Sequence, residues 1–328
     1  MAVRVGFLSV AHMHAWGYAK ALQHEPRAVL GPVWDENSER AAAFALAHGI
    51  EAAETIEQAL DACDAVVVTS DNRSHAELCE RAARAGRHIL CEKPLVTSEE
   101  EGARLIAAVD QAGVKLMTAF PCRYSPAFQR LVERVRAGDI GPIRAVCATN
   151  RGRCPFDWFV DPERSGGGAM IDHVVHVADL LRVLIGEDVV RVQAMVGNNM
   201  YGEEWEDTAM LTLEFPGGVF ATLDSSWSRT KSYKTWGDVA MNVVGDGGVI
   251  ELNLFGQALD VFDDAAMAHR LHGYGSDLDS GLVADFVRCV EEDSPPPITA
   301  HDGLQAARVA LAGYASMGAS EPAVPVSA

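Results

Sequence analysis

Apolar residues follow two alternating patterns over the first 120 residues of the chain. Short apolar runs cover residues 3–8, 28–34, 65–69, 88–91 and 114–119, and stretches with helical spacing cover 14–24, 38–48, 74–85 and 98–112. Apolar strands that alternate with amphipathic helices are typical of a parallel sheet covered on both faces. This part of the chain is therefore predicted to be α/β, with a doubly wound parallel sheet of the Rossmann type.

Two of these helices carry capping signals at their ends. Ser38 and Ser98 stand where an N-cap hydroxyl is expected. Gly49 and Gly113 follow the last helical residues, where glycine often ends a helix. We therefore expect both helices to be capped by serine and ended by glycine.

The pattern changes after about residue 140. Strand-like segments cover residues 143–150, 189–196, 208–215, 219–226, 240–244 and 249–254, and several alternate apolar with polar residues. Short turns at 216–218 and 245–248 join neighbouring segments, which predicts a large, mostly antiparallel sheet. With helices expected at 169–184, 280–292 and 302–316, the second part is predicted to be an α+β domain.

Composition narrows the classes of partner. The 328 residues suffice for two domains, and 27 Lys and Arg against 46 Asp and Glu give a formal net charge of −19. Such an acidic surface repels phosphate backbones and anionic lipids, so nucleic-acid and membrane partners are not expected. The start of the chain lacks a signal-peptide pattern, and the seven scattered cysteines form no C-x-x-C pair. We therefore expect a cytoplasmic protein with reduced thiols.

The turn after the first strand lacks the glycines of a dinucleotide-binding fingerprint. Residues 9–14 read SVAHMH where G-x-G-x-x-G is expected. Backbone N–H groups and a helix N-terminus can still hold a pyrophosphate there. Ser9 and Ala11 are the smallest replacements for glycine, and a protonated His12 or His14 would add positive charge. The alternative is an ordinary strand–turn–helix that binds no ligand.

A carboxylate follows the second strand at the position that commonly contacts the ribose of NAD. Asp35 lies 21 residues after His14, where a carboxylate accepts hydrogen bonds from the ribose hydroxyls. Glu36 comes next, so a 2′-phosphate would meet two negative charges, and NAD is favoured over NADP. The alternative is that Asp35 is a turn residue or a helix cap.

Residues 88–95, HILCEKPL, resemble a signature of the glucose–fructose oxidoreductase / inositol dehydrogenase family, often written Gfo/Idh/MocA. Further similarity covers residues 69–75 (TSDNRSH), 120–128 (FPCRYSPAF), the GGG of 166–168 followed by DHVVH at 172–176, and residues 302–314. Together these stretches span nearly the whole chain. The glycine-free first turn departs from the family pattern.

The resemblance implies both a domain organisation and a reaction. It implies a Rossmann domain over residues 1–120, a substrate-binding and oligomerisation domain over 121–301, and a terminal helix 302–316 that packs back on the first. Family members transfer a hydride between an alcohol carbon of a sugar-like substrate and a nicotinamide. Members usually dimerise over the open face of the second sheet, so a homodimer or homotetramer is expected.

The resemblance also implies which residues act. Lys93, Asp172 and His176 correspond to the catalytic set of the family. The implied cofactor-binding residues, added to Ser9, Ala11, His12 and Asp35, are Ser70, Asn72, His75, Glu92 and Lys93.

Chemistry agrees with the implied catalytic set. Oxidation of an alcohol needs a base for the hydroxyl proton, and the ordinary pKa of histidine suits His176 to this task. Asp172 lies one helical turn before it, on the same predicted helix face. Lys93 follows a parallel strand at its carboxyl end, where α/β sheets bind ligands. The alternative interpretation treats all three as surface residues in ordinary ion pairs.

Several residues remain candidates for substrate or metal binding. Arg123, Trp158 and His173 are predicted to contact the substrate. The basic, aromatic stretch 227–236 (WSRTKSYKTW) could contact a sugar or another subunit. The histidines at 12, 14, 173 and 176 raise the possibility of a metal site, but we predict none.

Three functions thus remain open at this point. The favoured function is an NAD-dependent oxidoreductase that acts on a secondary alcohol of a cyclic polyol, sugar or sugar derivative. The alternatives are a sugar-binding protein without redox activity, favoured by the glycine-free turn, and a metal-assisted lyase or hydrolase, favoured by the histidines.

Overall fold

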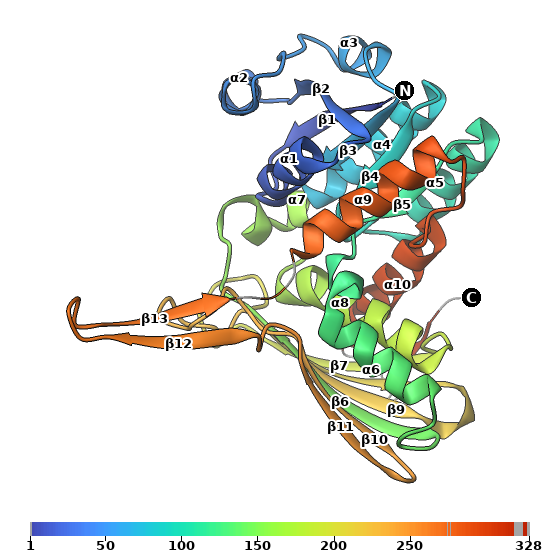
Figure 1. Ribbon diagram of the computed structural model, residues 1–328. Helices are drawn as coiled ribbons and strands as arrows, with labels where there is room; N and C mark the ends of the chain where they lie inside the picture. The colour runs from blue at the N-terminus through green and yellow to red at the C-terminus, as the bar shows by residue number, and fades with distance from the viewer. Residues whose placement is uncertain (1, 274, 276, 318–323, 327–328) are drawn as a thin grey trace. The chain divides into compact units, whose positions relative to one another are not determined.

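The computed structural model describes residues 2–273, 275, 277–317 and 324–326, and the chain forms two compact units (Figure 1). The first unit comprises Met1–Pro121, Asp157–Gly166 and Asp279–Arg308, and the second comprises Cys122–Phe156, Gly167–Leu278 and Val309–Ala328. The division inferred from the sequence also falls close to residue 120, but it groups 157–166 and 279–301 with the second domain.

The first unit contains the predicted parallel sheet. Its strands are β1 (Val3–Val10), β2 (Ala28–Trp34), β3 (Ala65–Thr69), β4 (His88–Cys91) and β5 (Leu116–Thr118), in the order β2-β1-β3-β4-β5. All neighbouring strands pair in parallel. The strand order reverses between β1 and β3, and ligands of open α/β sheets bind at the carboxyl ends of the strands at such a point.

Helices connect these strands. They are α1 (His14–His24), α2 (Ser38–His48), α3 (Ile56–Asp61), η1 (Asn72–Ser74), α4 (His75–Arg84) and α5 (Glu99–Ala112). The Ser98 hydroxyl caps α5 as predicted, but Asn37 rather than Ser38 caps α2, because the Asn37 side chain accepts from the N–H groups of residues 39 and 40. Gly49 and Gly113 end their helices in the left-handed conformation, as expected.

Later segments of the chain complete this unit. They form η3 (Asp157–Val160), α7 (Pro162–Ser165), most of α9 (Leu278–Glu291) and the first part of α10 (Ala300–Ser316). Leu304 and Ala307 belong to the same apolar core as Leu8, Val66 and Leu105. The expected contact between the last helix and the Rossmann core is therefore present for this part of α10.

The second unit is built on the predicted mostly antiparallel sheet. It contains η2 (Pro121–Tyr124, from its second residue), α6 (Pro126–Arg136), β6 (Ile143–Arg151), α8 (Ala169–Ile185), β7 (Arg191–Gly197), β8 (Thr208–Glu214), η4 (Pro216–Gly218), β9 (Phe220–Ser226), β10 (Ala240–Gly245), β11 (Gly248–Asn253) and β14 (Val324–Pro325). The strand order is β11-β10-β6-β9-β8-β7-β14. Among the described strands of this sheet, β6 and β9 pair in parallel and all other neighbours pair antiparallel. A long connection that includes α8 separates these two strands.

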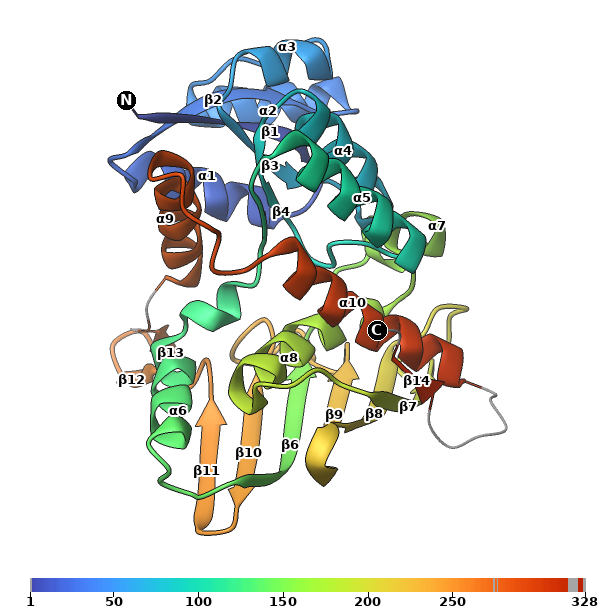
Figure 2. The same cartoon turned by 90° about the vertical axis from the view of Figure 1, so that its right-hand side faces the viewer.

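Helices cover one face of this sheet and leave the other face open (Figure 2). Burial alternates along β7 and β8, as in a sheet with one covered face, and α8 contacts β6, β8 and β9. On the other face, Met195, Met210, Phe220 and Val249 are each at least half exposed. The predicted open-faced sheet is therefore confirmed.

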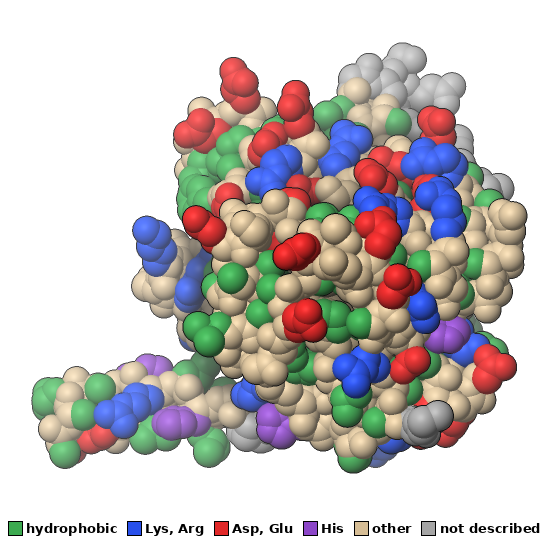
Figure 3. Space-filling view, turned by 90° about the horizontal axis from the view of Figure 1, so that it is seen from above, with side chains coloured by type: hydrophobic (Ala, Val, Ile, Leu, Met, Phe, Trp, Pro, Cys, Tyr) green, Lys and Arg blue, Asp and Glu red, His purple; other side chains and the backbone are tan. Residues whose placement is uncertain are grey.

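A hairpin that the sequence pattern did not reveal projects from the second unit. Strands β12 (Ala258–Asp263) and β13 (Ala268–Gly273) pair only with each other among the described strands. Hydrophobic, basic, histidine and acidic side chains are mixed along this arm (Figure 3), and Phe262 and Met267 are largely exposed. Over the described residues, no helix is long and apolar enough to span a membrane.

Candidate functional site

The first turn keeps the shape of a glycine turn without glycine. Ser9 occupies the place of the first glycine and has a left-handed φ of 61°. This conformation costs a non-glycine residue about 1–2 kcal/mol. Two bonds to β3 hold the turn: the His12 N–H donates to the Thr69 carbonyl (2.9 Å), and the Thr69 hydroxyl donates to the Ser9 carbonyl (2.7 Å). The N-terminus of α1 follows directly, as a dinucleotide site requires.

Asp35 lies against this turn, as the sequence predicted. Its buried carboxylate accepts from the Val10 N–H (2.7 Å) and the Ser9 hydroxyl (3.2 Å). It also accepts from the Asn37 N–H (2.7 Å) and from two nitrogens of Arg40 (2.8 and 2.7 Å). Arg40 contacts Glu36 as well. A 2′-phosphate at this corner would therefore meet the Arg40 guanidinium as well as the two predicted acids, and the preference for NAD stays a prediction.

The His12–His14 pair of the turn meets the carboxylate of the E-K-P stretch. Glu92 is fully buried and is bonded to His14 Nδ1 (2.9 Å), to the Tyr18 hydroxyl and to the Lys93 N–H (2.9 Å). Burial alone would raise the pKa of Glu92, but its contact with His14 and the nearby His12 and Lys93 hold that pKa well below its usual value. Burial by itself would lower the pKa of His14. The nearby Glu92 carboxylate has the larger, opposite effect, so the pKa of His14 is raised.

The same three side chains could offer ligand atoms to a metal. Atoms of His12, His14 and Glu92 lie within 4.8 Å of one another. However, His12 Nδ1 accepts a hydrogen bond from the His14 N–H (3.1 Å), which places the proton of a neutral His12 ring on Nε2. His14 also bonds to Glu92, so hydrogen bonds link these side chains, and the absence of a metal stays a prediction.

The predicted cofactor residues after β3 mainly fasten neighbouring loops. Ser70 donates to the Asp71 carbonyl (2.8 Å), and Asn72 donates to the Ser165 carbonyl (2.7 Å). His75 is fully buried, which lowers its pKa and keeps the ring neutral, so its Nδ1–H donates to the Pro94 carbonyl (2.8 Å). His75 thus fixes the loop that carries Lys93, whose peptide bond to Pro94 is cis.

Trp158 lies in the first unit, against the first turn. Its indole N–H donates to the Ala11 carbonyl (3.3 Å), and its ring stacks on Phe159 with centroids 3.8 Å apart. The Phe159 ring also lies 5.3 Å from the ring of His12. Trp158 is almost completely buried, so within this unit it supports the turn; its predicted contact with substrate stays a prediction.

In the second unit, α8 carries the other predicted catalytic residues. The Asp172 carboxylate accepts from the Trp227 indole (3.1 Å) and lies 3.2 Å from His173 Nε2. His173 Nδ1 is bonded to the Asn150 carbonyl (3.0 Å), so both ring nitrogens face oxygen atoms. His173 and Trp227 therefore orient Asp172 from inside the unit. His176 lies one turn further along α8 and is half-buried.

The glycines before α8 are required by two residues, Tyr314 and Glu206, that sequence reasoning missed. Glu206 accepts from the Gly168 N–H (2.7 Å) and from the Tyr314 hydroxyl (2.5 Å). A Cβ at Gly167 would overlap Tyr314, and one at Gly168 would overlap the backbone of Glu206. A carboxylate at a helix N-terminus is favourable, so Glu206 anchors the helix that carries Asp172. The triple glycine was the available signal, but it did not identify the partner.

Two other predicted substrate regions are held by internal ion pairs. Arg123 binds the fully buried Asp179 of α8 through two nitrogens (2.8 and 2.5 Å). Within the stretch 227–236, Arg229 pairs with Asp238 and lies 3.9 Å from the ring centroid of Tyr233. These contacts hold the side chains of Arg123 and Arg229 in place within the unit. Their contact with substrate stays a prediction.

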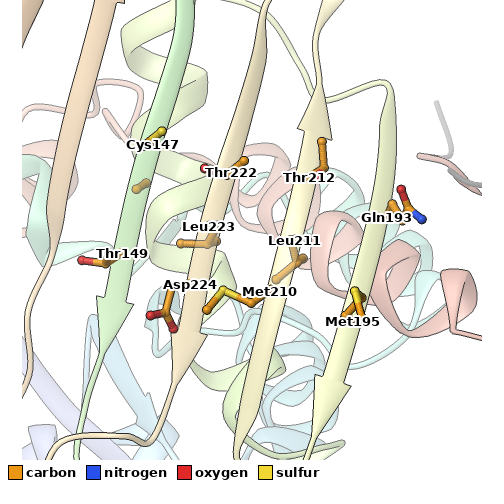
Figure 4. Close-up of a pocket in the computed structure, with 11 residues that line it drawn as sticks. Cys147, Thr149, Gln193, Met195, Met210, Leu211, Thr212, Thr222, Leu223 and Asp224 are labelled. Atoms are coloured by element: carbon orange, nitrogen blue, oxygen red, sulfur yellow. The ribbon is translucent and has the colours of Figure 1, made fainter.

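A shallow hollow of about 460 Å³ lies on the open face of the second sheet (Figure 4). Its lining includes Cys147, Met195, Met210, Thr222 and Asp224, which point away from α8. Asp224 is the one titratable carboxylate in this lining. Apart from this carboxylate and the Cys147 thiol, the described lining offers no side chain for acid–base chemistry.

Comparison with known proteins agrees with these observations. Residues 4–120 match the family described as "Oxidoreductase family, NAD-binding Rossmann fold", and residues 128–251 match "GFO/IDH/MocA C-terminal domain". The chain is 31% identical over 267 residues to myo-inositol 2-dehydrogenase of Thermotoga maritima, with 77% of this chain and 76% of that protein covered. It is 29% identical to inositol 2-dehydrogenase of Rhizobium meliloti, with 97% of each protein covered.

A solved structure is similar to this chain over almost its whole length. The crystal structure of a putative myo-inositol dehydrogenase from Sinorhizobium meliloti 1021 has a TM-score of 0.85 and 27% identity, and the alignment covers 99% of this chain and 100% of that one. The family matches also cover more than half of the chain. The chain is an NAD(P)-dependent oxidoreductase that belongs to the Gfo/Idh/MocA family, with an NAD-binding Rossmann domain and the C-terminal domain of that family.

Proposed function

We propose that this protein transfers a hydride between NAD and a secondary alcohol carbon of a cyclic polyol, sugar or sugar derivative. The Lys93 loop is the observation that carries the proposal. Lys93 is nearly buried at the carboxyl end of β4, and both its neighbours are fixed, Glu92 by His14 and Pro94 by His75. Inositol dehydrogenases among the relatives support a polyol-like substrate.

The first unit has the features that a nicotinamide cofactor needs. The left-handed Ser9, the N-terminus of α1 and the Asp35 carboxylate lie at the carboxyl edge of the sheet, beside the strand reversal. We propose that Ser9, Ala11 and His12 contact the pyrophosphate and that Asp35 contacts the adenosine ribose. Ser70, Asn72, His75, Glu92 and Lys93 complete the proposed cofactor-binding set. The bound nicotinamide supplies the hydride acceptor.

The residues of this chain supply the proton chemistry. We propose that the Lys93 ammonium holds the substrate oxygen and stabilises the negative charge that develops on it. The His176 imidazole accepts the hydroxyl proton, and Asp172, oriented by Trp227 and His173, supports that histidine electrostatically. Arg123, Trp158 and His173 remain the proposed substrate contacts, with the orienting roles described above. We further propose a cytoplasmic homodimer or homotetramer, consistent with seven free cysteines and the open sheet face.

The proposal is tested by cofactor binding and turnover. NADH and NADPH are titrated into the purified protein by fluorescence, and NAD-dependent oxidation of inositols, sugars and sugar acids is followed by nicotinamide absorbance. We expect saturable NADH binding and turnover of at least one polyol. Lys93→Ala should lower kcat at least about 100-fold and leave the Kd for NADH nearly unchanged.

The control separates a catalytic lysine from a general loss of charge. Lys115→Ala removes a lysine that pairs with Asp293 elsewhere in the same unit, and it should retain activity. A protein that binds neither NADH nor NADPH contradicts the proposed function. Normal turnover by Lys93→Ala contradicts the role given to Lys93.

A further inference from the structure

A row of aromatic rings within the second unit ends at Asp172 of the proposed catalytic set. The ring of Phe156 contacts that of Tyr201, with centroids 5.5 Å apart, and the ring of Tyr201 lies 5.4 Å from that of Trp205. The Trp205 ring lies 5.5 Å from that of Trp227, whose indole N–H donates to Asp172. Phe156 is 46% exposed and Tyr201 is 38% exposed, whereas Trp227 is fully buried. The row therefore leads from the surface of this unit to Asp172.

The backbone fixes the exposed end of this row. Residues 198–207 connect β7 to β8, and Asp207 Oδ2 accepts from the N–H groups of Met200 and Tyr201, both at 2.9 Å. Phe156 has a left-handed φ of 57°, which a non-glycine residue keeps only where its surroundings hold it. The aromatic row is therefore a preformed surface, and a ligand that binds there pays little to order it.

The connection that carries two of these rings is uniformly acidic. Its charged residues are Glu203, Glu204, Glu206 and Asp207. Glu206 accepts hydrogen bonds at the N-terminus of α8, but Glu203 and Glu204 are exposed and form no ion pair with any residue that the structure describes. Asp207 Oδ1 is buried and has no hydrogen-bond partner among the described residues. This negative charge is not neutralised by a basic side chain, so it attracts a cation.

A positively charged amino group suits both the rings and the acids. The negative face of an aromatic ring attracts a cation, and nearby carboxylates strengthen that attraction. A carboxylate or phosphate on the ligand would instead be repelled, and a neutral hydroxyl would gain only ordinary hydrogen bonds. The aromatic surface also suits the carbon atoms of a ring that carries the amino group.

We propose that Tyr201 and Trp205, together with Glu203 and Glu204, bind a positively charged amino group of the substrate. The preferred substrate is then an amino-substituted cyclic polyol or an amino sugar. This inference rests on the proposed function and narrows its substrate class. The buried indole of Trp227 lies between Trp205 and Asp172, so the amino group and the oxidised alcohol belong to different carbon atoms.

Matched pairs of small molecules test the proposed amine site by binding alone. Calorimetry on the protein saturated with NADH compares glucosamine with glucose, galactosamine with galactose, and scyllo-inosamine with scyllo-inositol. At least one amine should bind at least about tenfold more tightly than its hydroxyl partner. High salt should reduce this preference because it screens the exposed glutamates. N-acetylglucosamine, which lacks the positive charge, should lose any advantage that glucosamine has over glucose.

Substitutions separate a cation site from a merely structural loop. Trp205→Leu keeps an apolar side chain and removes the aromatic face, so it should weaken binding of the amine at least about threefold and that of its hydroxyl partner less than about twofold. Trp205→Phe restores an aromatic ring and should recover most of the preference. The double variant Glu203→Gln with Glu204→Gln should lower the preference at low salt and have little effect at high salt.

Phe262→Leu and Glu251→Gln are the matched controls. Phe262 on β12 and Glu251 on β11 are exposed in the same unit, and neither belongs to the acidic connection or the aromatic row. Both variants should keep the wild-type preference, and thermal unfolding verifies that every variant is folded. Equal or weaker binding of every amine relative to its partner, or an equal effect of Trp205→Leu on both members of a pair, overturns the amine site.

The outcome for the proposed function is measured separately. A protein that oxidises polyols with NAD but shows no preference for an amine contradicts this inference and leaves the oxidoreductase proposal standing. A protein that binds neither NADH nor NADPH contradicts the proposed function. In that case the same pairs are titrated without cofactor, and the amine site is accepted or rejected by the same criterion.

Discussion

At the residue scale, the positions of some site residues could be predicted from the sequence, whereas their hydrogen-bond partners could not. Ser9, Asp35 and Lys93 stand at the ends of strands, and the parallel sheet brings such positions to one edge regardless of side-chain detail. The partners of His173 and Arg123 were beyond the sequence, because they are chosen by packing between distant segments. For the same reason the pattern identified the acid at position 35 but not the arginine that covers it.

The left-handed Ser9 leads to a prediction about stability. A β-branched side chain is strongly disfavoured at this φ and cannot donate to Asp35, so Ser9→Val should destabilise the protein by about 2 kcal/mol. Ser9→Gly relieves the strain and loses the same hydrogen bond, so its effect should stay within about 1 kcal/mol. Urea unfolding of both variants measures the difference. Equal stability of the two would show that the turn does not constrain φ at Ser9.

At the element scale, length and periodicity decided what was predictable. Strands buried on both faces and, with the exception of α6, helices of ten or more residues were found with errors of a few residues. The short α3 and α7 carry too few residues to show a period. Helix α6 was missed although Ser125 caps it and Pro126 begins it, a recognisable start signal. The arm of β12 and β13 was missed because both strands are mostly exposed and lack an apolar face.

The contact between α1 and the loop after β4 makes stability depend on pH. The pKa of His14 is raised above 6.5, so its stabilising charge is fully present below that pH and is lost as pH rises through the raised pKa. The pKa of Glu92 is lowered from 4.5, so its contribution is lost only at strongly acidic pH. The melting temperature should therefore fall, relative to a variant that lacks the imidazole, as pH rises above about 6.5 and through the raised pKa of His14.

His14→Gln is that variant, and the two melting curves are compared at each pH. The comparison removes the effect of His48 and His88, whose lowered pKa values act in the opposite direction. The wild type should lose its advantage over His14→Gln as pH rises. A constant difference between the two proteins would mean that His14 is not charged beside Glu92.

The start of α8 allows a test of close packing at a helix end. Gly168 has a φ of −112° and a ψ of −127°, outside the common α and β regions, and a Cβ there would overlap the Glu206 backbone. Gly168→Ala should therefore cost about 3 kcal/mol of stability. Gly186 at the other end of α8 has a left-handed φ of 82° and open space around it, so Gly186→Ala should cost only about 1 kcal/mol. Chemical denaturation that ranks the two variants in the reverse order would contradict the packing argument.

At the scale of the whole molecule, one group of exposed apolar side chains lies on the open sheet face, which the proposed assembly would cover. Met195 is 76% exposed and Met210 is 58% exposed on neighbouring strands of the open face. Together with Phe220 and Val249, they form an apolar surface of the kind that monomeric proteins rarely leave uncovered. A twofold assembly would place this face against its own copy, so one substitution would act twice at each interface.

Met210→Glu should therefore shift the protein toward the monomer. Met210 pairs in register with Asp224, so a carboxylate at position 210 would be repelled by the Asp224 carboxylate. In a twofold assembly it would also be repelled by the new carboxylate of the partner copy. Sedimentation over a range of protein concentrations measures the change. Leu46→Glu is the control, because Leu46 is 87% exposed on α2 in the other unit and should leave assembly unchanged. If Met210→Glu assembles like the wild type, the open face is not the interface; if the wild type is itself monomeric, the apolar face is tolerated in water and needs no partner copy.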